Sequence, residues 1–124
     1  MASRARLEGL GRALRAVQRI PEAMREARND TLHEWADEVR TDAEARVPIR
    51  TGRLENALDH DVVEHWGRAE VGVWQEDALE YALYVEKGTS SMADQPYLVP
   101  AFEAARPAVP GKYRAAFRRH LGTG

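Results

Sequence analysis

Residues 54–75, LENALDHDVVEHWGRAEVGVWQ, mark the place where the hydrophobic pattern of this chain changes from helical spacing to alternation. In the second half of this stretch, Val71 and Val73 are separated by Gly72. Such alternation is typical of a β-strand with one buried face. Gly67-Arg68 supplies a tight connection between two such runs, so the stretch predicts a β-hairpin.

Two helices are predicted on the N-terminal side of this stretch. The first covers residues 4–20, where apolar residues recur every three or four positions opposite a face of arginines. Pro21 is tolerated in the first turn of a new helix but not inside an old one, so a second helix begins there. It ends near Arg46, because Val47 precedes Pro48 and such a residue avoids helical geometry. The apolar faces comprise Leu7, Leu10, Leu14 and Val17 in the first helix, and Met24, Ala27, Leu32, Trp35, Val39 and Ala43 in the second.

The second helix has an alternative start. Asn29-Asp30, Thr31 and Glu34 resemble a capping box, in which side chains satisfy the free backbone N–H groups of a helix N-terminus. On this interpretation the helix breaks and begins again at Thr31.

Helices are also favoured on the C-terminal side of the hairpin. The segment ALEYALYVEKG, residues 78–88, is short enough to be helix or strand, but Gly88 suits a helix C-cap and favours the helix. The last helical region, residues 97–121, is interrupted by Pro107 and Pro110. It ends with an apolar face formed by Tyr113, Phe117 and Leu121. No repeat or linker divides the chain, so the pattern predicts a single α+β domain.

Composition indicates an ordinary globular protein. The chain has 124 residues, of which 44% are hydrophobic and 31% charged. The absence of cysteine excludes disulfides, thiolate nucleophiles and cysteine-ligated zinc, and it fits an intracellular origin. No run approaches the roughly 18 consecutive apolar residues of a membrane span, so no membrane partner is expected. The N-terminal MASRARLEGLGRAL lacks the apolar core of a secretory signal.

Charge is distributed unevenly along the chain. Residues 1–28 hold seven arginines against three glutamates, a net charge of +4, and residues 106–124 carry +5 with no acidic residue. The total is −2, so the segment between them carries −11. Basic ends around an acidic middle suit electrostatic contact between copies or with other acidic surfaces, although solvated helix faces would give the same pattern.

No motif for catalysis, metal binding or cofactor binding was found. His60 and His65 are five positions apart, whereas a helical zinc motif needs histidines four apart, and on a strand they would face opposite sides. No serine lies in a Gly-x-Ser-x-Gly turn, and neither GRLE nor KGTS has phosphate-loop spacing. Glu86 could act as a general base, but a capping or ion-pairing role fits it better. We therefore expect a protein that is not an enzyme and binds no metal or cofactor.

Two motifs together resemble a known family. The first is VPIRTGRLENAL (Val47–Leu58), and the second is YALYVEKGTSSMADQPYLVPAFEAA (Tyr81–Ala105). In this order and spacing they are similar to the HK-type tail components of tailed bacteriophages, which are small minor tail, neck or tail-completion proteins that join head and tail. The resemblance covers roughly residues 24–105. Ala57 stands where many members carry serine and Tyr97 where many carry phenylalanine, and the helix before Pro21 lies outside the pattern.

The resemblance implies an α+β fold, with a long N-terminal helix packed on a small antiparallel sheet and flanked by shorter helices. It implies a non-enzymatic virion protein, assembled in the host cytoplasm, that forms a ring of six copies at the head–tail junction. The expected partners are portal-side neck proteins, tail-tube or tail-terminator proteins, and genomic DNA that passes through without sequence-specific binding. The alternative is a small nucleic-acid-binding or regulatory protein that uses its arginine-rich ends.

The motifs also give the candidate site residues. Turn positions are Pro48, Thr51, Gly52, Gly88 and Thr89, with the glycines allowing backbone conformations that a Cβ would obstruct. Candidate subunit-interface residues are Tyr81, Tyr84, Glu86, Pro96, Tyr97, Leu98, Pro100 and Phe102, although Tyr97, Leu98 and Phe102 could instead fill the core of the subunit. The expected organisation is a basic extension (1–20), the tail-component-like domain (21–105) and a basic helical tail (106–124).

Overall fold

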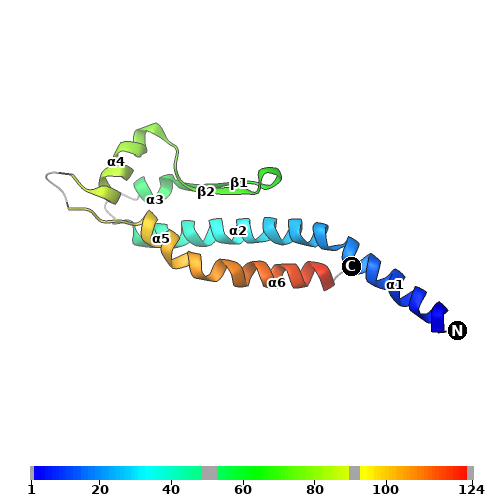
Figure 1. Cartoon of the computed structure of the whole chain (residues 1–124). Coiled ribbons are helices and arrows are strands. Elements are labelled where there is room, and N and C mark those ends of the chain that lie inside the picture. Colours follow the sequence, from blue (N-terminus) through cyan, green and yellow to red (C-terminus); the bar gives the residue numbers. More distant parts are fainter. Residues whose placement is uncertain (1, 49–52, 90–92, 123–124) are drawn as a thin grey trace. The chain divides into compact units, whose positions relative to one another are not determined.

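The computed structural model describes residues 2–48, 53–89 and 93–122 (Figure 1). The elements in chain order are α1 (Ala2–Gln18), α2 (Ile20–Arg46), α3 (Arg53–Ala57), β1 (Leu58–Val63), the 3-10 turn η1 (Glu64–Trp66), β2 (Arg68–Val73), α4 (Glu76–Lys87), α5 (Leu98–Ala105), the 3-10 turn η2 (Arg106–Ala108) and α6 (Val109–Gly122). This arrangement confirms the α+β class, with a long N-terminal helix, one antiparallel sheet and shorter helices. No helix in the described ranges has both the length and the apolar character needed to cross a membrane.

The helix α2 confirms the predicted start near Pro21 and the end at Arg46. It continues without a break through Thr31, whose hydroxyl donates to the carbonyl oxygen of Ala27 at 2.7 Å. The alternative start at Thr31 is therefore wrong, because this hydroxyl bonds one turn back inside the helix instead of capping a new one. Most of the predicted apolar face is confirmed, since Ala27, Val39 and Ala43 are buried, but Met24 is 47% exposed and its neighbour Ala23 is buried instead.

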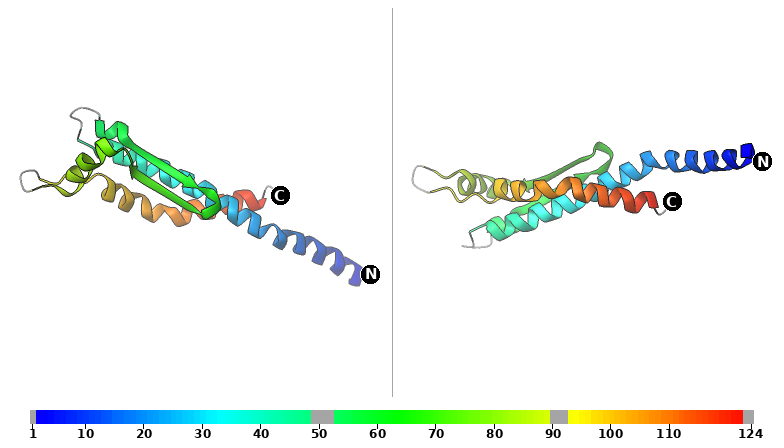
Figure 2. Two further views of the ribbon diagram at one scale, coloured as in Figure 1. Left: turned by 90° about the horizontal axis from the view of Figure 1, so that it is seen from above. Right: turned by 60° about the horizontal axis from the view of Figure 1, so that its bottom comes forward.

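The predicted hairpin is confirmed, but its connection is longer than expected. Strands β1 and β2 pair antiparallel, with Leu58 opposite Val73 and Val63 opposite Arg68 (green in Figure 2). The turn η1 and Gly67 join them, and Arg68 already belongs to the second strand. Gly67 has φ 61° and ψ 39°, and its N–H donates to the carbonyl of Glu64. The tight Gly67-Arg68 connection is thus wrong, because the left-handed glycine closes a 3-10 turn.

The chain divides into two compact units, which are Met1–Thr31 with Pro110–Gly124, and Leu32–Val109. The second unit contains the hairpin and the main hydrophobic core. The buried members of this core are Ala36, Val39, Ala43, Val47, Leu54, Leu58, Val71, Ala82, Val85, Tyr97, Ala101 and Ala105. Most are small, and Tyr97 is the largest of them. Trp35 and Phe102 stack beside this core with ring centroids 5.6 Å apart.

The first unit combines α1, the start of α2 and most of α6. Its buried residues are small, namely Ala23, Ala27 and Ala116, together with Thr31. Tyr113 and Phe117 stack along α6 at 6.4 Å, as the predicted apolar face of that helix requires. The interruption at Pro107 is also confirmed, since η2 separates α5 from α6.

Candidate interaction site

The carboxylate of Glu86 binds the N-terminus of α5. One oxygen, Oε2, accepts the backbone N–H of Tyr97 at 2.6 Å and that of Leu98 at 3.3 Å, and Oε1 accepts the N–H of Val99 at 2.7 Å. The next residue is Pro100, which has no N–H to satisfy. Each backbone N–H group at this helix N-terminus that lacks a partner within the helix is therefore bonded to Glu86. A negative charge is also favourable at this end of the helix dipole.

Two further contacts hold the chain before α5 against α4. The N–H of Gln95 donates to the carbonyl of Val85 at 2.8 Å, and the hydroxyl of Tyr97 donates to the carbonyl of Ala82 at 3.1 Å. Tyr97 is only 2% exposed. Burial, and secondarily the charge of Glu86, raises the pKa of Tyr97 to about 12. We refer to these contacts of Glu86, Val85 and Ala82 with Gln95–Val99 as the Glu86 cap.

Gly88 ends α4 in a backbone conformation that favours glycine. Its φ is 77° and its ψ is 175°, a region that residues with a Cβ rarely adopt. Its N–H donates to the carbonyl of Tyr84 at 2.7 Å and closes the last turn of the helix. This corner directs the chain away from α4 only two residues after Glu86. The two halves of the second sequence motif, on either side of residues 90–92, therefore meet through the Glu86 cap.

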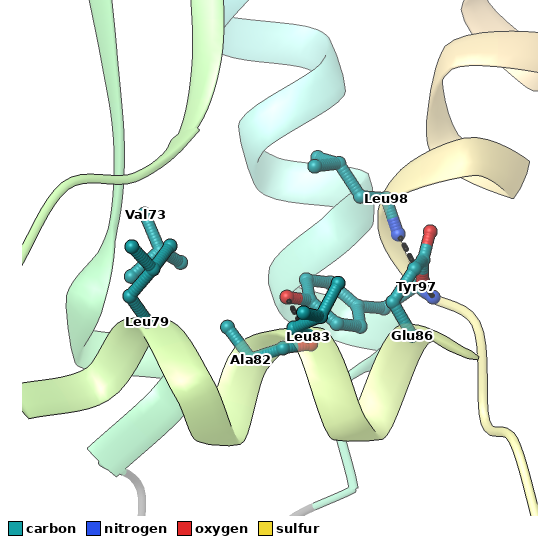
Figure 3. A pocket seen from close by; sticks show the side chains of 7 residues that line it. All are labelled: Val73, Leu79, Ala82, Leu83, Glu86, Tyr97 and Leu98. Atoms are coloured by element: carbon teal, nitrogen blue, oxygen red, sulfur yellow. Dashed lines mark hydrogen bonds between the residues drawn. The ribbon is translucent and has the colours of Figure 1, made fainter. Parts of the chain in front are cut away.

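An apolar groove lies beside the cap (Figure 3). Its volume is about 260 Å³. It is lined by Val73 at the end of β2, by Leu79, Ala82, Leu83 and Glu86 on α4, and by Tyr97 and Leu98. Leu79 and Leu83 are both 51% exposed and lie one helical turn apart. Exposed apolar side chains that gather around a concave surface are typical of a contact site for another molecule.

The other sequence candidates occupy different environments. Tyr97 belongs to the buried core, and Leu98 and Phe102 are half-buried against it; these are the three residues of the core-filling alternative. Tyr81 is also half-buried against the core, and Pro100 is half-buried in the first turn of α5. Tyr84 and Pro96 are exposed, and the hydroxyl of Tyr84 donates to Glu80. Pro48 lies two residues after the end of α2, Thr89 is exposed beyond Gly88, and Thr51 and Gly52 lie outside the described residues.

The histidines considered for metal binding and the glutamate considered for catalysis make other contacts in the structure. His60 lies 3.4 Å from a guanidinium nitrogen of Arg40, and the ring of His65 contacts that of Trp66 edge-on. Across residues 2–48, 53–89 and 93–122, no group of three or more acidic or histidine side chains is arranged to hold a metal ion. Both oxygens of Glu86 accept backbone N–H groups, so its observed role is to stabilise a helix start.

Comparison with known families agrees with the resemblance in the sequence. Residues 11–88 match the family model described as "Bacteriophage HK97-gp10, putative tail-component". The chain belongs to this family. No curated protein matches the chain, and no solved structure does. This phage tail-component match begins before residue 24, so it includes the end of α1, which the two motifs alone had left outside the family pattern.

The family match ends at Gly88 and so covers only part of the groove. The α4 side of the Glu86 cap lies inside the match, whereas Gln95–Val99 lie beyond it. Sequence reasoning missed the exposure of Leu79 and Leu83 and the contact of Gln95. The helical spacing of the two leucines was visible in the sequence, but only the fold shows that each is 51% exposed.

Proposed function

We propose that this protein is a structural component of a phage virion, and that copies of it assemble into a ring at the junction of head and tail. Membership of the tail-component family over residues 11–88 is the observation that carries the proposal. The family implies a location in the virion and contacts with other virion proteins. The finer proposal is that the ring consists of six copies and lies between the portal-side neck proteins and the tail tube or its terminator.

The Glu86 cap supports a role in assembly. Its hydrogen bonds fix residues 95–99 before any partner binds, which lowers the entropic cost of docking. Pro96 and Val99 are exposed within this fixed segment, and Tyr84 is exposed on α4. We propose that these exposed residues contact a neighbouring subunit, while the buried Tyr97 holds the surface in shape. This role is structural rather than catalytic.

The charge distribution supports passage of DNA without sequence-specific binding. The segment between the basic ends carries a net charge of −11. Duplex DNA carries about one negative charge per 1.7 Å of its axis, so an acidic channel wall would repel it and prevent sticking. We propose that part of the acidic segment faces the channel. Mapping of these acidic residues to the outer wall of the ring would overturn this part of the proposal.

The proposal is tested on the purified full chain and on intact particles. Sedimentation over a range of concentrations should reveal a closed oligomer without DNA, and electron microscopy should show rings. In particles from the parent phage, a gold-labelled antibody should mark the head–tail junction. Single subunits at every concentration, together with an unlabelled junction, would overturn the proposal.

The second candidate, a nucleic-acid-binding protein, is favoured by the basic ends, which carry +4 and +5. Part of this charge already has a protein partner, since Arg119 donates a hydrogen bond to Asp30. Salt-dependent binding of duplex DNA by the monomer at physiological ionic strength would favour this second function over the first.

A further inference from the structure

The face of α1 opposite Arg12 is apolar and exposed. Leu10, Leu14 and Val17 are 54%, 52% and 58% exposed. Each therefore presents apolar surface that a second molecule could cover. They are spaced four and three residues apart, so they lie on one face of the helix. This is the spacing with which an amphipathic helix enters an apolar groove.

The groove beside the Glu86 cap has matching dimensions and chemistry. Its lining on α4 runs from Leu79 to Glu86, and the apolar face of α1 runs from Leu10 to Val17. Each stretch covers seven helical steps, or about 10 Å. Leucines at both surfaces can bury one another, and Val99, which follows the groove residue Leu98 in the chain, is also exposed.

The net charges of the two helices are opposite. α1 contains four arginines and one glutamate, a net charge of +3, whereas α4 contains four acidic residues and Lys87, a net charge of −3. Arg12 faces away from the apolar face of α1, so it would stay in solvent when that face is buried. The attraction between the opposite net charges of α1 and α4 therefore acts over a distance and orients the approaching helix without burying ion pairs.

We infer that α1 of one copy docks in the groove between α4 and Tyr97–Leu98 of a second copy. The inference rests on the proposed self-assembly and names the contact that produces it. Every copy carries one such helix and one such groove, and the two surfaces differ. The contact is therefore heterologous and repeats from copy to copy, as a ring requires.

Cysteine pairing tests this contact directly, because the natural chain contains no cysteine. Full-length variants Leu10→Cys, Leu14→Cys and Val17→Cys are each mixed with a Leu83→Cys variant that carries a size tag, under mild oxidation. Docking raises the local concentration of the two thiols, so at least one mixture should form the mixed disulfide about ten-fold faster than undocked chains. Raising the salt concentration should reduce this advantage.

Two controls keep the test specific. Arg12→Cys lies on the opposite face of α1, and Ala104→Cys is an exposed position on α5 outside the groove. Equal rates in the pairs Arg12→Cys with Leu83→Cys, or Leu14→Cys with Ala104→Cys, would overturn the inference. So would an intramolecular disulfide in a Leu14→Cys/Leu83→Cys double variant at high dilution, because the helix would then occupy its own groove.

Sedimentation of the same proteins separates this inference from the proposed function. An oligomer that forms without selective cross-linking at any of the three positions on α1 overturns the inference and leaves the ring intact. A protein that stays monomeric at all concentrations overturns both.

Discussion

Glu86 meets a requirement that every helix start imposes, because the first backbone N–H groups of a helix have no partner within it. Replacing it by alanine removes the acceptor of three N–H groups, and we expect a loss of about 2 kcal/mol in the free energy of unfolding. Glu86→Gln keeps one carbonyl oxygen and should lose about half as much. Urea unfolding measures both changes.

Glu103→Ala is the matched control for this prediction, since Glu103 is an exposed glutamate on α5 itself. It should change the free energy of unfolding by less than about 0.5 kcal/mol. Equal stabilities of the Glu86→Ala and Glu103→Ala variants would show that the cap contributes nothing.

Tyr97 makes the stability of the fold sensitive to alkali. Its pKa is raised from 10.0 to about 12, so between these values the unfolded chain loses a proton that the folded chain keeps. The free energy of unfolding is therefore unaffected by this group below pH 10 and falls as the pH rises toward 12, by about 2–3 kcal/mol. Tyr97→Phe should cost about 1 kcal/mol at neutral pH and reduce the alkaline loss.

The control for Tyr97 is Tyr113→Phe, which removes the hydroxyl of a tyrosine on α6 whose ring stacks on that of Phe117. Unfolding followed by circular dichroism at several pH values should show an unchanged alkaline slope for this variant. An unchanged slope for Tyr97→Phe as well would contradict the predicted role of its buried hydroxyl.

Gly88 and Gly72 form a natural pair for comparison. Gly88→Ala places a Cβ at φ 77° and ψ 175°, which should cost about 1–3 kcal/mol of unfolding free energy. At Gly72, near the end of β2, an added Cβ meets no atom within 4 Å. Gly72→Ala should therefore be neutral or stabilising by up to about 1 kcal/mol. Thermal unfolding of the two variants checks the contrast, which a similar Tm for both would refute.

At the level of helices and strands, a local sequence signal was sufficient to predict a helix boundary where no other contact competed with it. Pro21, Pro48 and Gly88 place helix boundaries correctly, because a missing N–H or a positive φ restricts the chain whatever surrounds it. The signals failed where tertiary or neighbouring contacts competed. Thr31 resembles a cap but bonds the carbonyl of Ala27 inside a continuous helix.

The helices α2 and α6 are linked by a cluster of charged groups. His120 lies 2.7 Å from Glu26 and 2.6 Å from Asp30, and Arg119 also donates to Asp30. The hydrogen bond from His120, followed by that from Arg119, lowers the pKa of Asp30 below 3.8. Its contribution to stability is therefore complete above that pH and is lost as the pH falls through the lowered value.

We expect Asp30→Asn to weaken this link by about 0.2–1 kcal/mol at neutral pH, because the pair is exposed to solvent. The variant should also lose less stability than the natural chain when the pH falls below 3.8. Hydrogen exchange of α6 amides at neutral and acid pH measures this difference. Asp37→Asn, an exposed change elsewhere on α2, is the control, and identical exchange in both variants would refute the link.

For the molecule as a whole, the sequence predicted the fold class and the family but only part of the site. Glu86 and Tyr97 were singled out because they belong to one motif, and the capping alternative for Glu86 was recognised. The contact between Glu86 and Tyr97, which lie on either side of residues 90–92 in the chain, depends on how α4 and α5 pack and could not be predicted from the motif. The exposure of Leu79 and Leu83 could not be predicted, since a helical spacing of leucines reads equally as core.

Opposite charges on α1 and α4 affect how fast copies meet more than how long they remain bound. We therefore expect an Arg12→Glu/Arg15→Glu variant to associate about ten-fold more slowly at low salt, since it reverses the sign of α1. At about 0.5 M salt the difference should nearly vanish, because the charges are screened beyond a few ångströms. Leu14→Asp should instead raise the dissociation rate at either salt concentration, because it places a charge on the apolar face of α1. Stopped-flow mixing of fluorescently labelled chains measures both rates, and a salt-independent effect of the arginine changes would contradict attraction between these helices.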